Sequence, residues 1–175
     1  MSCDITSFAE VKNKRSGVWE KVYNKFSLDD YDKKKKNKDK GDSPFYEQSY
    51  SLFGFLANVR NYDECEPLSL PKGIPDDCNI DIFTDYECER FSAHSSSYLT
   101  LRELVQFDYD KIFWNRRIER EIAPNQFDCT ARAEEGEGKM ISYRDNLPDL
   151  FFIHLEELKQ LGDLDDVRII FWFNS

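Results

Sequence analysis

Residues 167–173 (VRIIFWF) constrain the fold most strongly, because they form a nearly continuous run of apolar and β-prone side chains. Such a run is typical of a strand that is covered on both faces of a sheet. We therefore expect a central strand here, beside a strand at the N-terminus. Residues 4–11 alternate between two faces, and Ser16 and Gly17 supply a turn before residues 18–23, which indicates a β-hairpin.

Three segments predict helices. Residues 50–59 carry apolar side chains at helical spacing, and Asn61 is suited to the left-handed conformation at a helix end. Thr100 and Glu103 form a T-x-x-E capping box, which marks a helix start. Residues 148–161 carry another apolar stripe. This order of elements favours an α+β fold, with a mainly antiparallel sheet packed against about three helices.

The remaining segments predict less regular structure within a single domain spanning residues 1–175. Residues 29–44 are rich in lysine and lack an apolar period, so we expect a surface loop or insertion. Residues 62–92 combine prolines with acids and predict a long ordered loop with at most short helical turns. Residues 112–143 indicate short strands or a broken helix.

The charge balance limits the partners that the chain can have. The net charge of −10 and the sequence pI near 4.8 argue against binding to duplex nucleic acid, which needs a surplus of lysine and arginine. The exception is the basic block at residues 33–40 (KKKKNKDK), for which a solvated loop and a phosphate-binding arm are both open interpretations. No window approaches the roughly 20 apolar residues of a spanning helix, so we expect a cytoplasmic protein without a membrane partner.

Cysteine and histidine usage argues against a metal site or another cofactor. The five cysteines are odd in number and contain no C-x-x-C pair, which suits a reducing compartment. Only His94 and His154 are present, and His154 sits on an apolar helix face, where a satisfied core histidine is expected. Residues 134–139 (EEGEGK) fail the spacing of a phosphate loop, and their acids would repel phosphate.

The candidate binding residues fall in three segments. His94 and Ser95, with Ser97, precede the capped helix and suggest an anion pocket at its N-terminus; the alternative is that the serines only satisfy turns and that the imidazole packs on an aromatic ring. Arg60 with Asn61 could orient a carboxylate or phosphate, or Arg60 could pair with an acid in the following loop. The full set adds two loop residues and a stacking ring: Arg60, Asn61, Lys72, Asp76, His94, Ser95, Ser97 and Tyr98.

Several of these segments carry a resemblance when taken together. An N-terminal CDI strand, YSLFGFLANVRN, GIPDD, HSSSYLTLREL and a terminal DVRIIFWF resemble an uncharacterised family of small proteins encoded by bacteriophages, prophages and large viruses. In that family an arginine often precedes the glycine of the loop, whereas Lys72 stands there in this chain and offers a cation without a bidentate fork. The resemblance implies a viral protein that acts against host defence.

Three functions follow as hypotheses. The first is a non-enzymatic protein that sequesters an anionic, nucleotide-like small molecule. The second is an acidic inhibitor that docks on a host defence protein or a nucleic-acid-binding protein, for which the charge of −10 is the supporting feature. The third is a hydrolase that uses His94 with nearby acids. A homo-oligomer is compatible with each of them.

Overall fold

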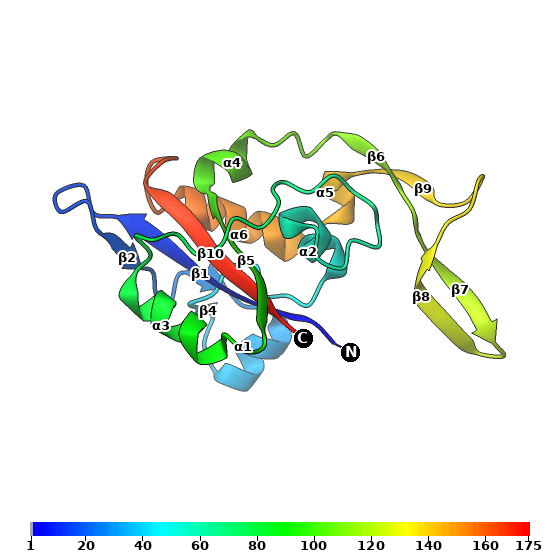
Figure 1. Cartoon of the computed structure of the whole chain (residues 1–175), viewed down its shortest axis with the longest axis horizontal. Helices are drawn as coiled ribbons and strands as arrows, with labels where there is room; N and C mark the ends of the chain where they lie inside the picture. The colour runs from blue at the N-terminus through cyan, green and yellow to red at the C-terminus, as the bar shows by residue number, and fades with distance from the viewer. Residues whose placement is uncertain (1) are drawn as a thin grey trace. The chain divides into compact units, whose positions relative to one another are not determined.

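The computed structural model describes residues 2–175, and contacts within the chain group these residues into two compact units (Figure 1). The sheet unit contains residues 2–48, Pro71–Phe107 and Asp149–Ser175. The ribbon unit contains Ser49–Leu70 and Asp108–Pro148. The fold is α+β with an antiparallel sheet, as the sequence predicts. No helix within residues 2–175 is long and apolar enough to cross a membrane.

The sheet unit is built on four antiparallel strands. The C-terminal strand is central, lies beside the N-terminal strand, and is buried from Val167 to Phe173. The hairpin between the first two strands is also confirmed. In spatial order the strands are β2 (Trp19–Lys21), β1 (Asp4–Lys12), β10 (Val167–Asn174) and β5 (Ala93–Thr100).

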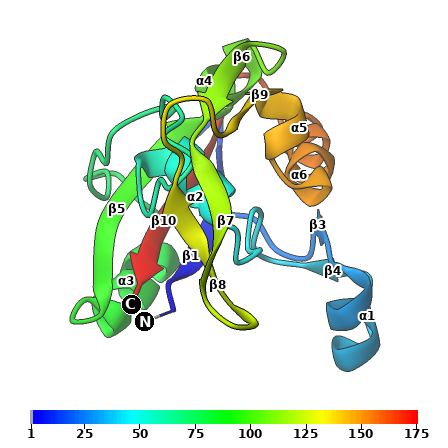
Figure 2. The same cartoon turned by 90° about the vertical axis from the view of Figure 1, so that its right-hand side faces the viewer.

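Helices lie on opposite sides of this sheet (Figure 2). On one side, α3 (Ile80–Glu89) buries Ile82 against Ile170 and Trp172 of β10. On the other side lies α6 (Asp149–Lys159), which packs near α4 (Leu101–Gln106). Because every second residue of a strand faces the same side, a strand between two helical layers needs apolar residues on both faces, and β10 is apolar and buried from Ile169 to Phe173.

A buried ion pair ties the sheet to the loop before α3. Arg168 Nε donates to Glu10 Oε2 at 2.6 Å, and neither side chain is more than 6% exposed. Glu10 Oε1 accepts the backbone N–H of Asn79 at 2.5 Å. The guanidinium also contacts Asp77 at 2.9 Å and lies 3.9 Å from the ring centroid of Trp19. The cluster is therefore a fully bonded polar network, and it fixes the position of the GIPDD loop.

Two predicted loops contain helices. Residues 29–44 hold α1 (Asp30–Lys36), whose first turn is capped by the side chain of Asp29, followed by β4 (Lys40–Gly41), which pairs with β3 (Phe26–Ser27). The predicted loop at residues 62–92 contains the ten-residue helix α3, capped by Asn79. Both loop predictions were wrong for these stretches, because the helices start at side-chain caps and bury almost no apolar stripe of their own.

The capped helix and the core histidine agree with the sequence. Thr100 and Glu103 form a complete capping box at the start of α4. His154 is fully buried; its Nδ1 accepts the Phe45 N–H at 2.9 Å, so Nε2 is the protonated nitrogen and donates to the Ser27 carbonyl at 2.8 Å. Burial lowers the pKa of His154 below its ordinary value, which matches a neutral imidazole.

The ribbon unit combines one buried helix with two antiparallel strand pairs. Its core contains Phe55, whose ring packs against those of Tyr109 and Tyr143. The ring of Phe113, which lies on a strand, also packs on Tyr143. Of the two alternatives that the sequence left open at residues 112–143, short strands or a broken helix, the structure contains the short strands. The elements are α2 (Tyr50–Ala57), β6 (Ile112–Asn115) paired with β9 (Lys139–Ser142), β7 (Arg117–Ala123) paired with β8 (Gln126–Arg132), and α5 (Tyr143–Asn146).

Candidate functional site

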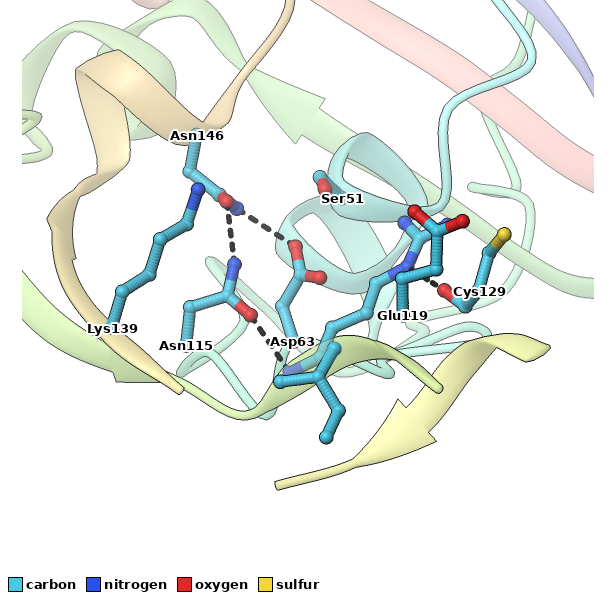
Figure 3. Close-up of a pocket in the computed structure, with 9 residues that line it drawn as sticks. Ser51, Asp63, Asn115, Glu119, Cys129, Lys139 and Asn146 are labelled. Atoms are coloured by element: carbon cyan, nitrogen blue, oxygen red, sulfur yellow. Dashed lines mark hydrogen bonds between the residues drawn. The ribbon is translucent and has the colours of Figure 1, made fainter. Parts of the chain in front are cut away.

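A polar pocket of about 330 Å³ lies within the ribbon unit (Figure 3). Its walls come from α2, the loop after α2, the paired strands β6 and β9, the β7–β8 hairpin and α5. Side chains of both charges and two amides line it: Ser51, Asp63, Asn115, Arg117, Lys139 and Asn146. Segments far apart in the sequence therefore supply one concave surface, which is the usual arrangement of a ligand site.

An ordered chain of hydrogen bonds forms the back of the pocket. The backbone N–H of Arg117 donates to Asn115 Oδ1 at 2.9 Å, and Asn115 Nδ2 donates to Asn146 Oδ1 at 2.8 Å. Asn146 Nδ2 then donates to Asp63 Oδ2 at 2.8 Å (Figure 3). Because each amide oxygen accepts, its nitrogen faces the next acceptor, so the chain runs in one direction and fixes the orientation of both amides.

Burial makes this row of hydrogen bonds rigid. Asp63 is 2% exposed and Asn115 is 4% exposed, and a buried polar group is costly unless it is hydrogen-bonded. Asp63 Oδ1 has no hydrogen-bond partner among residues 2–175, although the residue lines the pocket. One acceptor atom at the base of the pocket is thus left for a solvent molecule or a ligand.

Lys139 brings a positive charge to the pocket rim. Its side chain extends beside Asn115 towards Asn146 (Figure 3), and within the described chain its ammonium group has no ion-pair partner. Two of the three preceding acids, which in the sequence argue against phosphate at this segment, are engaged elsewhere: Glu137 and Glu134 contact Arg120 at 2.8 and 3.6 Å. Arg120 therefore reduces the repulsion that is expected from the acidic segment.

Arg117 contributes a second cation. Its Nε donates to the Cys129 carbonyl at 2.7 Å, which ties the side chain to the neighbouring strand of the hairpin. Its guanidinium lies 6.0 Å from the ring centroid of Tyr50, and the guanidinium of Arg60 lies 5.7 Å from the same centroid. The sequence-predicted Arg60 is thus linked to the pocket through one aromatic ring, and its Nη1 also contacts the Tyr62 hydroxyl at 3.4 Å.

The other predicted residue of this unit has a structural role. Asn61 Nδ2 donates to the Cys65 carbonyl at 2.7 Å, and its Oδ1 accepts the Cys65 N–H at 3.1 Å. The side chain therefore closes the turn after α2. The sequence placed the left-handed helix end at Asn61, but α2 ends at Asn58, which has the positive φ of 59°. Asn58 is therefore the C-cap of α2, and Asn61 belongs to the turn that follows it.

The remaining predicted site residues belong to the sheet unit, where several have protein partners. Lys72 Nζ pairs with Glu103 at 2.6 Å, and Ser97 Oγ accepts the Lys72 N–H at 3.1 Å. Tyr98 packs beside the Ile170 cluster, and Asp76 is exposed on the loop. Because Arg60 and Asn61 lie in the other unit, a single pocket made from the whole predicted set stays a prediction.

His94 does not lie at the capped helix start. It is on β5, six residues before Thr100, and an extended strand of that length spans roughly 20 Å. The expected anion pocket at the N-terminus of α4 was therefore placed wrongly for this residue. His94 instead stacks on Phe173, with Nδ1 at 3.1 Å from the Ser95 hydroxyl and Nε2 at 3.2 Å from the Ser175 hydroxyl.

Most of the pocket residues carry no recognisable signal in the sequence. Asp63, Asn115 and Asn146 each stand beside a charged residue, and they form no spaced motif. The strand pairing brings two of the pocket residues together, since Asn115 lies directly opposite Lys139. The only hint in the sequence is Gly138 followed by Lys139, and this pair belongs to the acidic segment that is expected to repel phosphate.

Comparisons with protein-family models, with curated proteins and with solved structures found no match for this chain. Within residues 2–175, no group of three or more histidine, cysteine or acidic side chains is arranged to hold a metal ion. Function must therefore be argued from the chemistry of the pocket.

Proposed function

We propose that this protein is a non-enzymatic binding protein and that the pocket of its ribbon unit holds a small anionic molecule of nucleotide-like character. The observation that carries the proposal is Lys139, whose ammonium group stands without an ion-pair partner in the described chain beside two oriented amides. Charge that is not consumed by the protein itself is available to a ligand.

The balance of donors and acceptors defines the ligand. Lys139 and Arg117 carry N–H groups beyond the one that Arg117 uses, and each asparagine amide keeps a second N–H. These donors suit the oxygens of a phosphate or carboxylate. Asp63 Oδ1 and the exposed Glu119 offer acceptors for N–H or O–H groups. A molecule with an oxyanion at one end and donors at the other fits both sets, which describes a sugar phosphate or a nucleotide.

The first turn of α2 adds to this environment. Ser51 is the second residue of the helix and lines the pocket, so the positive end of the helix dipole lies at this side. In the viral setting that the sequence resemblance implies, such binding would remove a nucleotide-derived signal from the host. That step rests on the resemblance and not on the pocket.

The test is native mass spectrometry of freshly purified protein, followed by denaturing analysis of anything released. We expect an additional mass that is released as an anion and that disappears in Lys139→Met, because the variant keeps the length of the side chain and loses its charge. Lys34→Met is the matched control, since Lys34 is an exposed lysine of the sheet unit without an ion-pair partner among residues 2–175.

Two results together would contradict the proposal. The first is a mass without any bound ligand for both the wild-type protein and Lys139→Met. The second is the absence of binding when the wild-type protein is titrated with inorganic phosphate, ribose 5-phosphate and the four 5′-mononucleotides. Equal loss of the bound mass in Lys139→Met and Lys34→Met would also contradict it, because that pattern reports general charge and not this pocket.

A further inference from the structure

Resting on the proposed function, we infer that the ligand carries a planar aromatic ring that stacks on Trp114, while its anionic group is held at Lys139. The inference starts from a second concavity of about 370 Å³ in the same unit. Trp114, Gly138, Lys139 and Met140 line it, so Lys139 belongs to both hollows.

The indole of Trp114 is held in one orientation. Its Nε1 donates to the Glu137 carbonyl at 3.0 Å, and the guanidinium of Arg116 lies 4.4 Å from the ring centroid. Gly138 leaves the room that this arrangement needs, because a Cβ at that position would come within 2.6 Å of Trp114 Nε1. A ring fixed by a hydrogen bond, a cation and a glycine does not have to be ordered when a ligand binds.

The same indole remains open to solvent. Trp114 is 39% exposed and Met140, directly opposite it on β9, is 67% exposed. Ile112 lies two residues earlier on the same face of β6 and is 61% exposed. An ordered tryptophan that presents its surface to a concavity, next to a flexible thioether, is a platform for a flat apolar group.

Strand geometry joins this platform to the polar pocket. Neighbouring residues of a strand point to opposite faces, so Trp114 and Asn115 face different hollows. However, Asn115 and Lys139 are the last pair of the β6–β9 ribbon, and the chain enters that pair through Gly138. The two faces therefore meet at the ribbon end, where the long side chain of Lys139 can serve an anion whose aromatic substituent reaches around to Trp114.

The remaining charges agree with this assignment. Glu137, the acid of this concavity, is paired with Arg120 at 2.8 Å, which leaves Lys139 as its uncompensated charge among the described lining residues. A ring attached to a phosphate matches one apolar platform and one cation. A ring with a positive charge would meet Lys139 unfavourably.

The experiment compares two kinds of probe on the intact chain by isothermal titration calorimetry. Ribose 5-phosphate carries the anion and the sugar, and the four 5′-mononucleotides add a base to the same group. Stacking on an aromatic side chain changes affinity by about 10- to 100-fold per base, so we expect at least one mononucleotide to bind more tightly than ribose 5-phosphate by that factor.

Variants locate the effect. Trp114→Ala should bring the mononucleotide to the affinity of ribose 5-phosphate and leave ribose 5-phosphate unchanged, whereas Trp114→Phe should retain most of the difference. Phe127→Ala is the matched control, because Phe127 is a 52% exposed aromatic residue of the same unit that lines neither hollow. Unchanged ribose 5-phosphate binding also shows that the ribbon of the alanine variant is folded.

The outcomes separate the two claims. If all mononucleotides bind no more tightly than ribose 5-phosphate, or if Trp114→Ala leaves their affinity unchanged, the stacking inference is overturned and the anion pocket stands. If ribose 5-phosphate binds to Lys139→Met as tightly as to the wild-type protein, the proposed function is contradicted, because the charge of Lys139 then does not hold the anion. If none of the probes binds, the stacking inference is rejected, and a clean unliganded mass of the purified protein then rejects the proposed function as well.

Discussion

Neutralising Glu10 should destabilise the sheet unit more than any change to an exposed ion pair. Glu10 is fully buried, and its two oxygens accept one hydrogen bond each, from Arg168 and from the backbone of Asn79. In Glu10→Gln one oxygen becomes an NH₂ group, which cannot accept either bond. The remaining amide oxygen can accept only one of the two bonds, and Arg168 keeps its charge in a buried site with the exposed carboxylate of Asp77 as its ion-pair partner.

The size of the effect follows from burial. Removing one partner of a buried ion pair costs about 3–5 kcal/mol, because the other charge stays desolvated. Asp77 also pairs with Arg168, at 2.9 Å, but its side chain is 64% exposed, so Asp77→Asn should cost less than about 1 kcal/mol. The pair Glu10→Gln and Asp77→Asn therefore tests the same guanidinium from a buried and an exposed side.

Urea unfolding, followed by circular dichroism and by tryptophan fluorescence, measures both variants. Trp19 reports on this site because its ring lies against Arg168. With a urea slope of about 2 kcal/mol per molar, Glu10→Gln should lower the midpoint by about 2 M and Asp77→Asn by less than about 0.5 M. Equal shifts for the two variants, or a shift below about 0.5 M for Glu10→Gln, would refute the argument from burial.

Three further predictions concern other parts of the fold. Burial holds the pKa of His154 below its ordinary 6.5, so at acid pH the unfolded chain binds a proton that the folded chain does not. Stability should therefore fall as the pH drops below about 6.5. His154→Gln should flatten this dependence in urea midpoints measured from pH 5 to pH 8. Gly138→Ala should weaken the ribbon more than Gly136→Ala, because both have a positive φ but only the first would push a Cβ against Trp114; hydrogen exchange of β6 and β9 measures the difference. Thr100→Ala should cost about 0.5–2 kcal/mol of unfolding free energy through loss of the capping box.

Each of these has a result that would count against it. Parallel pH profiles for wild type and His154→Gln would mean that another group carries the acid sensitivity. Equal exchange rates in the two glycine variants would leave the φ angle alone as the cause, and Trp114 would not be constrained by Gly138. A Thr100→Ala protein as stable as the wild type would show that the N-terminus of α4 needs no side-chain cap.

Elements with a local physical signal could be predicted from the sequence. The alternation of residues 4–11, the nearly continuous apolar run at residues 167–173 and the Thr100 capping box depend on neighbouring residues alone, and each gave the correct element. The helices α1 and α3 could not be found by the apolar period. No residue of α1 is buried, and Ile82 is the one buried residue of α3. Neither helix therefore has an apolar stripe that could be recognised in its sequence.

The candidate pocket shows the same limit more strongly. Arg60 was predicted for its charge, and the structure connects it to the pocket through Tyr50. Asp63 and Asn146 are 83 residues apart, and a hydrogen bond between their side chains follows from tertiary packing, which no local pattern encodes. The acidic neighbours of Lys139 predict repulsion of an anion when they are taken as free charges, whereas in the folded chain Glu134 and Glu137 are paired with Arg120 of β7.

The central claim is that an anion occupies the pocket of the ribbon unit, and the most direct test is the alkylation rate of Cys129. This exposed thiol lines the pocket, and the equally exposed Cys88 of the sheet unit provides an internal control. Peptide mass spectrometry after timed iodoacetamide treatment gives both rates, with and without the tightest-binding mononucleotide at ten times its Kd. Occupancy should slow the Cys129 reaction by about tenfold and leave Cys88 unchanged; an unchanged Cys129 rate, while calorimetry shows that the nucleotide is bound, would place the ligand elsewhere and contradict the account.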